Sequence, residues 1–369
     1  MTPPQSLARR RIVDLSQFIA GSVCGQLLAD FGAQVVKVEP PAGDPARSLR
    51  GTDHGSIYFR SYNTSKSSLV VDLETEDGRD QLEELLGVAD ALVVNFGPRT
   101  LRRLGLDWDH LHQRHPHLVM AAVSGYGLDD ERTAFDSTAQ AESGYAYTNA
   151  DVDGTPRIGS GYLTDVAAGL YAAFTTAMML VDPTRSTGTL VDVAMLEVAM
   201  STLVGAELLS GADGGMVQPG AGSRDRATAP SNIYPCRDGY VYAYAGLDKH
   251  WDRLRSDVGG PAADALERLD RADEFDAYMA AWTQGRSVED VCTHLGELGV
   301  PVAPALHPVD ALGRATERLA GIIARDRDGG AVPQFPVLIG GERPPRRGAP
   351  PLDGASAADP WMLEGSAAT

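Results

Sequence analysis

The sequence of 369 residues has few cysteines and no long hydrophobic run. Its three cysteines, Cys24, Cys236 and Cys292, lack the spacing of a metal site or a disulfide framework, which favours reduced thiols in a cytoplasm. No segment approaches 18 consecutive apolar residues, and the first ten residues, MTPPQSLARR, contain no apolar core of a signal peptide. The sequence therefore predicts a cytoplasmic protein that neither crosses a membrane nor is exported, and it predicts no metal site.

Positive charge is also scarce. The chain has 32 Lys and Arg against 50 Asp and Glu, a formal net charge of −18. No basic stripe offsets this acidic background, which argues against a nucleic acid or an anionic membrane as a partner. A small polyanionic ligand would need a local basic pocket.

Apolar runs alternate with helix-like segments over the first half of the chain. A strand at 11–15, a helix at 21–31 and a second strand at 34–39 predict a parallel βαβ unit. Further strands are expected at 69–73, 91–96, 118–123 and 189–193, with helices at 76–88 and 195–209. This alternation predicts an α/β fold with an open, mainly parallel, Rossmann-like sheet.

At this length the chain exceeds one ordinary core, so two domains are expected. Glycines gather in residues 210–230 and predict a linker or a mobile lid. The alternating strand at 240–244 and the helical segments after it predict a small α+β domain. We expect a large domain of residues 1–200 and 329–369, and a small domain with its linkers of residues 201–328.

The first βαβ unit imitates a dinucleotide fold without its glycine fingerprint. Glu39 ends the second strand, where such folds hold a ribose. Residues 16–22, between the first strand and its helix, contain no G-x-G-x-x-G. The sequence therefore argues against a nicotinamide oxidoreductase.

A carboxylate, Asp165, stands at the start of a long apolar helix that ends at Asp182. One face of this helix consists of larger apolar residues and is expected to be buried: Val166, Leu170, Phe174, Met178 and Val181. Another face has almost no side-chain volume, so a second helix or backbone could approach it closely. From the residues alone, Asp165 is either an N-cap at the positive end of the helix or a nucleophile.

Short motifs along nearly the whole chain occur in the order typical of one enzyme family. They are Asp14-Leu15-Ser16, Ala20-Gly21, Gln26 to Ala33, Val36 to Glu39, Asn63 with Lys66, Val71-Asp72-Leu73, Asn95 to Pro98, Ser124 to Gly127, Ala139-Gln140, Val191-Asp192-Val193, Tyr234 to Tyr240 and Gly299-Val300-Pro301. In order and spacing the sequence resembles the class III CoA-transferases, the family of formyl-CoA transferase, the carnitine CoA-transferase and α-methylacyl-CoA racemase.

The resemblance implies a catalytic role for Asp165. The family's nucleophilic aspartate is followed four residues later by glycine, as Asp165 is by Gly169. A carboxylate suits the reaction because it exchanges acyl groups with carboxylic acids through a mixed anhydride. Resemblance also implies an aspartyl-CoA thioester intermediate, and the backbone amide of Ala20 as a donor to the developing oxyanion.

Resemblance further implies where coenzyme A binds and how the chain assembles. Acyl-CoA would be a substrate together with a small carboxylic acid, with no tightly bound cofactor and with an interlocked homodimer. The expected CoA contacts are Ile19, Lys66, Asn95, Phe96, Arg99, Arg103 and Leu104.

Several positions depart from the family pattern and leave alternatives open. Phe135 stands where the racemase branch has histidine, which argues against racemisation of α-methylacyl-CoA. Thr64 and Ser67 stand where many relatives are basic, so a catalytically altered CoA-binding relative is a further alternative. Ile19 replaces a glutamine of formyl-CoA transferase, and the glycine-only loop of that enzyme is not reproduced in residues 211–222.

Overall fold

The computed structural model describes residues 6–203, 209–214, 221–313, 321–326, 329–355 and 359–361. By its internal contacts the chain divides into two compact units. Unit 1 comprises Met1–Ala146, Ile158–Leu209 and Ala320–Thr369, and unit 2 comprises Tyr147–Arg157 and Ser210–Leu319. We keep the domain boundaries expected from the sequence as a prediction.

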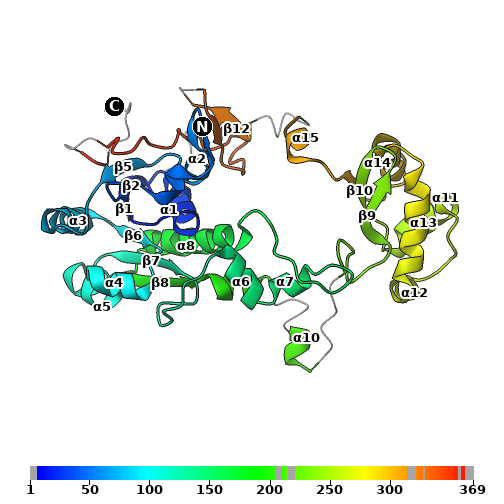
Figure 1. The fold of residues 1–369 in the computed structure, drawn as a ribbon, viewed down its shortest axis with the longest axis horizontal. Coiled ribbons are helices and arrows are strands. Elements are labelled where there is room, and N and C mark those ends of the chain that lie inside the picture. The colour runs from blue at the N-terminus through cyan, green and yellow to red at the C-terminus, as the bar shows by residue number, and fades with distance from the viewer. Residues whose placement is uncertain are drawn as a thin grey trace. The chain divides into compact units, whose positions relative to one another are not determined.

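Unit 1 is built on a six-stranded sheet in the order β5-β2-β1-β6-β7-β8, and all five strand pairings are parallel (Figure 1). The strands are β1 (Arg11–Asp14), β2 (Gln34–Glu39), β5 (Ser67–Val70), β6 (Ala91–Val94), β7 (Val119–Ser124) and β8 (Thr189–Ala194). Their near-continuous Val, Ala and Leu content is typical of parallel strands buried on both faces. The predicted α/β fold with an open parallel sheet is confirmed.

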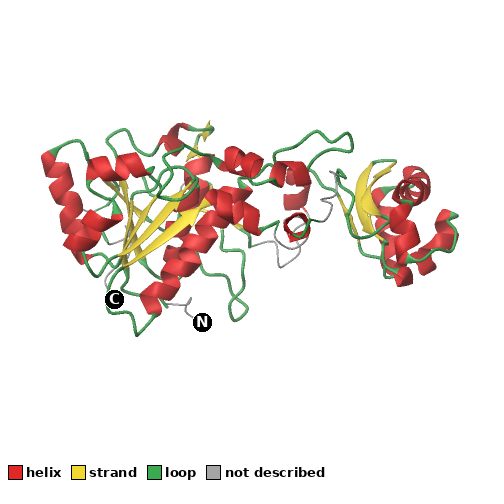
Figure 2. Ribbon diagram, turned by 90° about the horizontal axis from the view of Figure 1, so that it is seen from below, coloured by secondary structure: helices red, strands yellow, loops and turns green. Residues whose placement is uncertain are grey.

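Helices cover both faces of this sheet (Figure 2). Residues such as Ile12 and Val93 pack with α1 (Ala20–Asp30) and α8 (Leu163–Val181) on one face. Their neighbours Val13 and Leu92 pack on the other face with α3 (Glu76–Val88), α4 (Pro98–Leu104) and α5 (Trp108–Arg114). Two apolar cores therefore hold each strand in register, because side chains alternate along a strand.

Helices α1 and α8 cross at Gly169. A Cβ atom at this glycine would lie 2.5 Å from the backbone oxygen of Ala20 and 2.6 Å from Cβ of Val23. The small face of α8, including Ala168, Gly169 and Ala172, is buried there. The expected close approach to this face is thus found, and α1 is the approaching helix.

The prediction that the larger apolar residues of α8 are buried was wrong. Leu170, Phe174, Met178 and Val181 are 51%, 65%, 43% and 44% exposed, and Val166 is half-buried. The reason is steric, since only the small face lets α8 pack against the backbone of α1. Among the described residues α8 is the one helix long and apolar enough to cross a membrane, and it packs into the core of unit 1.

Unit 1 also contains shorter elements outside the six-stranded sheet and its long helices. They are the 3-10 helix η1 (Pro45–Ser48), β3 (Gly51–Thr52), β4 (Gly55–Ser56), α2 (Ile57–Tyr62), α6 (Asp136–Glu142), α7 (Tyr145–Thr148, which ends in unit 2), α9 (Met195–Ser201), β12 (Ile323–Arg325) and β13 (Ala331–Pro333). Helix α9 ends eight residues before the expected end at 209, and residues 204–208 lie outside the described part. The tail lies along unit 1, where Arg346 pairs with Asp30 at 2.6 Å.

Unit 2 contains a three-stranded antiparallel sheet in the order β11-β10-β9. Its strands are β9 (Ser231–Cys236), β10 (Gly239–Tyr244) and β11 (Val302–Pro304), and its helices are α11 (Asp248–Val258), α12 (Ala265–Asp270), α13 (Ala272–Gln284), α14 (Val288–Glu297) and α15 (Pro308–Gly313). Helix α10 (Leu209–Ala212) lies in the glycine-rich segment, of which residues 215–220 are outside the described part.

Candidate functional site

The loop after β1 meets the loop after β6 at the point where the strand order reverses. β1 has β2 on one side and β6 on the other, which is where open parallel sheets bind ligands. The backbone N–H of Gln17 donates to Oδ1 of Asn95 at 2.8 Å, and Nδ2 of Asn95 donates to the Gln17 oxygen at 2.7 Å. Asn95 therefore fixes the loop after β1.

A buried cluster of charges lies under the same loop. Nζ of Lys66 is 2.7 Å from Asp14, and Nζ of Lys37 is 2.9 Å from Asp44. Lys37 also donates to the Ser16 oxygen at 2.7 Å. All four charged side chains are at most 2% exposed, so the two ammonium groups and the two carboxylates neutralise each other inside the protein.

Lys66 is therefore placed away from solvent, unlike a residue that binds phosphate. Its ammonium also donates to the oxygen of Ser22 and to Oδ1 of Asn63, both at 2.8 Å. Burial lowers the pKa of Lys66 to about 8, against the opposing charge of Asp14. With all three donors used internally, the role that this geometry supports is structural.

The backbone amides of Ser16, Gln17 and Phe18 in this loop all donate to side-chain oxygens. Ser16 N–H donates to Asp14 at 2.9 Å, and Phe18 N–H donates to Asp44 at 3.3 Å. Phe18 adopts a φ of 59°, a left-handed conformation that bends the chain into the helix. The amide of Ala20, in the first turn of α1, has no acceptor among the described residues, as is common for first-turn amides.

Asp165 lies in the first turn of α8, but it does not cap that helix. The N-cap is Tyr162, and the carboxylate of Asp136 accepts from the backbone N–H of Thr164 at 2.8 Å and of Asp165 at 3.3 Å. No donor to the Asp165 carboxylate exists among the described residues. The capping function that the sequence left open for Asp165 thus belongs to Asp136.

The partly buried carboxylate of Asp165 has an unusually high pKa. Burial raises it from 3.8 to about 7, and the charge of Asp136 adds to the rise. Desolvation without compensating hydrogen bonds destabilises the ionised form and makes the carboxylate more basic. Perturbed groups of this kind cluster at reactive sites.

Asp165 and Gly169 are one helical turn apart and therefore lie on the same face of α8. Because Gly169 contacts the Ala20 oxygen, the face that carries Asp165 is directed to the start of α1. The packing of α8 on α1 thus directs the face that carries Asp165 toward the segment of Ile19 and Ala20, which are both 5% exposed.

A cavity of about 300 Å³ opens beside this loop at the carboxyl ends of β1, β2, β5 and β6. Its lining includes three of the residues expected from the sequence, Phe96, Arg103 and Leu104, together with Gln17. Arg103 is half-exposed and pairs with Glu74 at 2.7 Å. Arg99 is exposed on α4 outside this lining. Asn95 does not line the cavity either, but it holds Gln17, which does.

Sequence reasoning did not find the charge cluster or the role of Gln17. Asp14 and Lys66 are 52 positions apart, and Gln17 and Asn95 are 78 apart, so no local pattern relates them. Glu39 stands where dinucleotide folds hold a ribose. Its carboxylate instead pairs with Arg47 at 2.6 Å and accepts a hydrogen bond from the Ser68 hydroxyl. Within the described residues no group of three His, Cys, Asp or Glu side chains could hold a metal ion.

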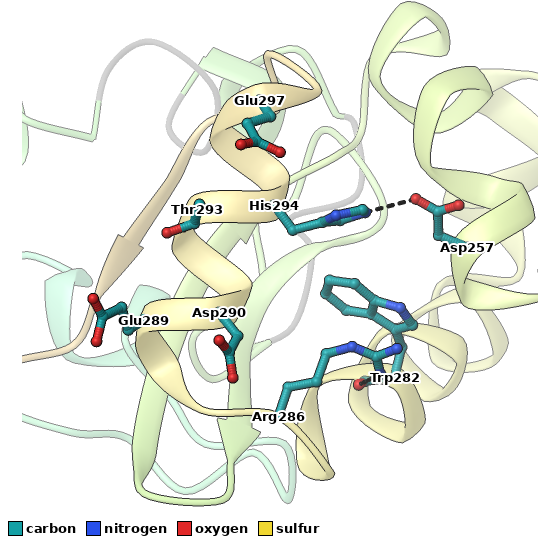
Figure 3. Close-up of a pocket in the computed structure, with 8 residues that line it drawn as sticks. All are labelled: Asp257, Trp282, Arg286, Glu289, Asp290, Thr293, His294 and Glu297. Carbon is teal, nitrogen blue, oxygen red and sulfur yellow. Dashed lines mark hydrogen bonds and ion pairs between the residues drawn. The ribbon is translucent and has the colours of Figure 1, made fainter.

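A larger hollow, of about 690 Å³, lies on unit 2 (Figure 3). Four carboxylates line it, and one of them, Asp257, pairs with His294 at 2.7 Å. Arg286 stacks over the Trp282 ring. The excess of negative charge would repel phosphate groups, so this hollow is unsuited to a polyanionic ligand.

Comparisons with known proteins identify the family of this chain. The family model described as CoA-transferase family III matches residues 7–356. The succinyl-CoA–D-citramalate CoA-transferase of Chloroflexus aurantiacus is 33% identical over 81% of this chain and 78% of its own length. The succinyl-CoA:mesaconate CoA-transferase of Haloarcula marismortui is 31% identical over 81% of this chain and 80% of its own length.

Solved structures agree as well. The crystal structure of Rv3272 from Mycobacterium tuberculosis superimposes with a TM-score of 0.82 at 26% identity, covering 96% of this chain and 98% of that one. A CAIB/BAIF family protein from Brucella suis has the same fold, with a TM-score of 0.83 at 24% identity over 97% of this chain and 98% of that chain. The family model, the relatives and the shared fold thus agree, and the chain belongs to the class III CoA-transferase family.

Proposed function

We propose that this CoA-transferase moves CoA from an acyl-CoA to a carboxylic acid through an aspartyl-CoA thioester on Asp165. The observation that carries this proposal is the partly buried Asp165 carboxylate, which lacks hydrogen-bond donors and has a pKa of about 7. A carboxylate with this pKa is about half ionised at neutral pH, and its ionised form is more nucleophilic than that of an exposed carboxylate.

The proposed reaction begins when an oxygen of Asp165 attacks the thioester carbonyl of the donor. The C–S bond breaks, CoA leaves as a thiolate, and a mixed anhydride remains. The thiolate then attacks the aspartyl carbonyl carbon, which releases the donor acid and forms the aspartyl-CoA thioester. The acceptor carboxylate reverses both steps, so atoms and charges balance without a cofactor.

Charge develops on a carbonyl oxygen in each of these steps. The Ala20 amide is our candidate donor to it, because that N–H has no acceptor among the described residues and α8 packs its Asp165 face against the start of α1. Asn95 and the buried charge cluster hold the preceding loop, which supports a fixed donor position.

We propose that CoA binds in the cavity at the carboxyl ends of the strands. Arg103 would pair with a phosphate in exchange for Glu74, and Phe96 and Leu104 supply apolar contact for the nucleotide. Two further expected CoA contacts lie outside the cavity lining. Ile19 is the last residue of the loop before α1, and Arg99 is an exposed cation on the same helix as Arg103.

Two alternatives receive less support from the geometry. Phe135 supplies no imidazole for racemisation and is 62% exposed. Thr64 and Ser67, at positions that are basic in many relatives, are buried and bonded to Gln26 and to the Pro360 oxygen. Their side chains do not line the proposed CoA cavity, so their lack of charge does not weaken it.

We further propose a cytoplasmic homodimer. The exposed apolar residues of α8, Leu170, Tyr171, Phe174 and Met178, form a stripe that a second copy could cover. The unpaired thiols of Cys24 and Cys236 are compatible with a reducing compartment. Sedimentation or light scattering would measure the assembly directly.

Intact-mass spectrometry tests the proposed reaction. The protein is incubated with a panel of acyl-CoA donors and quenched in acid. We expect a mass increase equal to CoA less one water, because a thioester replaces the carboxyl group, and this adduct should be stable in acid and released by hydroxylamine. Asp165→Asn should form no adduct, provided that deamidation to Asp is excluded by mass, and an adduct on that variant would refute the assignment.

A further inference from the structure

Gln140 is a fully buried glutamine on α6 to which the proposed reaction assigns no part. Its Nε2 donates to Oδ2 of Asp136 at 2.6 Å, one helical turn earlier on the same face of α6. It also pairs with the backbone of Gly159, whose N–H donates to Oε1 at 2.8 Å and whose oxygen accepts from Nε2 at 3.2 Å. Both ends of this amide are therefore used inside the protein.

The partners of Gln140 fix the orientation of its amide. The Gly159 N–H requires an oxygen, and the Asp136 carboxylate requires a donor, so a flipped amide would lose both hydrogen bonds. The two hydrogens of Nε2 each have an acceptor. The Asp136 carboxylate thus meets a donor that is held in one position.

Asp136 connects Gln140 to the first turn of α8. While Oδ2 of Asp136 accepts from Gln140, Oδ1 accepts from the backbone N–H of Thr164 at 2.8 Å and of Asp165 at 3.3 Å. Asp136 is only 7% exposed, so water could not readily replace a donor that this carboxylate lost. The place of its charge beside Asp165 therefore depends on Gln140 as well as on the helix start.

Gln140 also anchors the segment that leads into α8. Residues 155–163 are exposed except for Gly159, which is half-buried. Gly159 lies three residues before Tyr162, the N-cap of α8. One side chain therefore holds both the carboxylate at the start of α8 and the chain that enters this helix.

Asp136 is the one acid among the described residues whose charge acts on Asp165. Burial raises the pKa of Asp165, and the charge of Asp136 raises it further. Tyr62 on α2 is within electrostatic range of Asp165, but burial raises its pKa, so it stays neutral at pH 7. The first turn of α1 carries no titratable side chain. Other acids on helices packed against α8 have partners of their own: Glu142 on α6 pairs with Arg132, and Glu197 on α9 acts on Asp192.

We propose that Gln140 is a positioning residue for CoA transfer, whose amide holds the Asp136 carboxylate beside Asp165. This inference rests on the proposed function, because it concerns the nucleophile of that reaction. Without the amide donor, Asp136 turns away from α8 or takes up a proton. Both changes remove negative charge beside Asp165, which then becomes less basic.

The test compares the pH dependence of kcat/KM for acyl-CoA in the wild type and in Gln140→Met, which keeps the side-chain length without its hydrogen bonds. The acidic limb of the wild-type profile should lie near pH 7, where Asp165 ionises. In Gln140→Met this limb should move about 0.5–1 pH unit lower. The kcat should fall while KM stays within about twofold, because Gln140 does not line the CoA cavity.

Gln140→Glu is the conservative variant. Two carboxyl groups this close share one proton, so the new side chain keeps an O–H donor to Asp136 and an oxygen for the Gly159 N–H, and the limb should stay at its wild-type position. Gln26→Met is the matched control, because Gln26 is a buried glutamine on α1 that donates to the Ser61 oxygen at 3.0 Å. It should lower stability without moving the limb.

Asp136→Asn tests whether Gln140 acts through Asp136. This variant keeps an oxygen for the Thr164 N–H but removes the charge, so its limb should also lie lower, and adding Gln140→Met should move it no further. If Gln140→Met does not fold, Asp136→Asn and Gln140→Glu decide the outcome. An unchanged limb in Gln140→Met or in Asp136→Asn overturns the proposal, and so does a matching shift in Gln26→Met or Gln140→Glu.

The CoA adduct on Asp165 separates this failure from a wider one. If the wild type forms the adduct and the limb of Gln140→Met is unchanged, only the positioning role is refuted. If no donor gives an adduct, the proposed function fails and the positioning role fails with it.

Discussion

Replacing Asp165 by Asn should abolish transfer and at the same time stabilise the protein at alkaline pH. The amide has nearly the same shape as the carboxylate, but it is neutral at every pH. In the folded protein the pKa of Asp165 is about 7, against an ordinary value of 3.8. The folded state thus binds the Asp165 proton more tightly than the unfolded chain does.

The sign and size of the effect follow from this difference. Below pH 4 the side chain is neutral in both states and contributes nothing. As the pH rises from about 4 to about 7 the unfolded chain ionises first, which destabilises the folded state, and above pH 7 the cost is constant. The full difference corresponds to about 4 kcal/mol at about 1.36 kcal/mol per tenfold change. Because Asp165 retains some solvent contact, we expect about half of this, about 2 kcal/mol.

Thermal unfolding of the wild type and of Asp165→Asn between pH 4 and pH 9 measures this difference in stability. The variant should unfold about 4–8 °C higher at pH 8, and the two curves should converge near pH 4. Asp182→Asn is the matched control at the other end of α8. The pKa of Asp182 is lowered by hydrogen bonds from Thr184, so its substitution should destabilise the protein above pH 4.

A helix-capping role for Asp165 predicts the opposite result. A first-turn carboxylate that is stabilised by the helix dipole gains about 0.3–1 kcal/mol at neutral pH, and the Asn variant would lose it. Lower stability of Asp165→Asn at pH 8, or a difference independent of pH, would therefore refute the reasoning. The same titration predicts that wild-type kcat/KM falls below about pH 7, as Asp165 becomes protonated.

Three further predictions follow from the site and its support. Arg103→Ala should weaken CoA binding by about 1–3 kcal/mol in calorimetry, whereas Arg102→Ala, on the same helix but outside the cavity lining, should not. Gly169→Ala should separate α8 from α1 and lower kcat at least tenfold, whereas Gly87→Ala, in open space on α3, should raise stability by about 0.5–1 kcal/mol. Because Phe135 supplies no acid or base, an (S)-2-methylacyl-CoA incubated in deuterium oxide should yield no (R)-epimer by chiral chromatography.

The secondary structure of the sheet was predictable because its strands are short apolar runs. β1, β2 and β8 lie within a residue of the expected ranges, and α3 coincides with its expected range. The buried face of α8 was not predictable from periodicity. A repeat of large apolar residues shows that they share a face, but it does not show whether that face meets the chain's own core. The face of α8 that contains Gly169 is the buried one, because only this face leaves room for the backbone of Ala20.

Single residues that stand in a family motif could be named from the sequence as candidates, whereas contacts between distant residues could not. Asp165 and Arg103 were expected from motifs. Lys66 was expected to contact coenzyme A because it lies in a segment where members of the family bind CoA, yet Asp14 and Asn63 enclose its ammonium. Burial of that kind depends on the fold of four segments at once, and no local pattern in the sequence records it.

The contrast between two acids at one helix end explains why the pKa of Asp165 is raised. Free N–H groups and the dipole at a helix start normally stabilise a carboxylate and lower its pKa. Here Asp136 occupies those N–H groups, at 2.8 Å from Thr164, and brings a second negative charge beside Asp165. Asp165 therefore receives the repulsion of a neighbouring carboxylate without the hydrogen bonds of a cap. Asp136 stabilises the helix start, and Asp165 is left as the more basic carboxylate, which is the state that the proposed attack on a thioester requires.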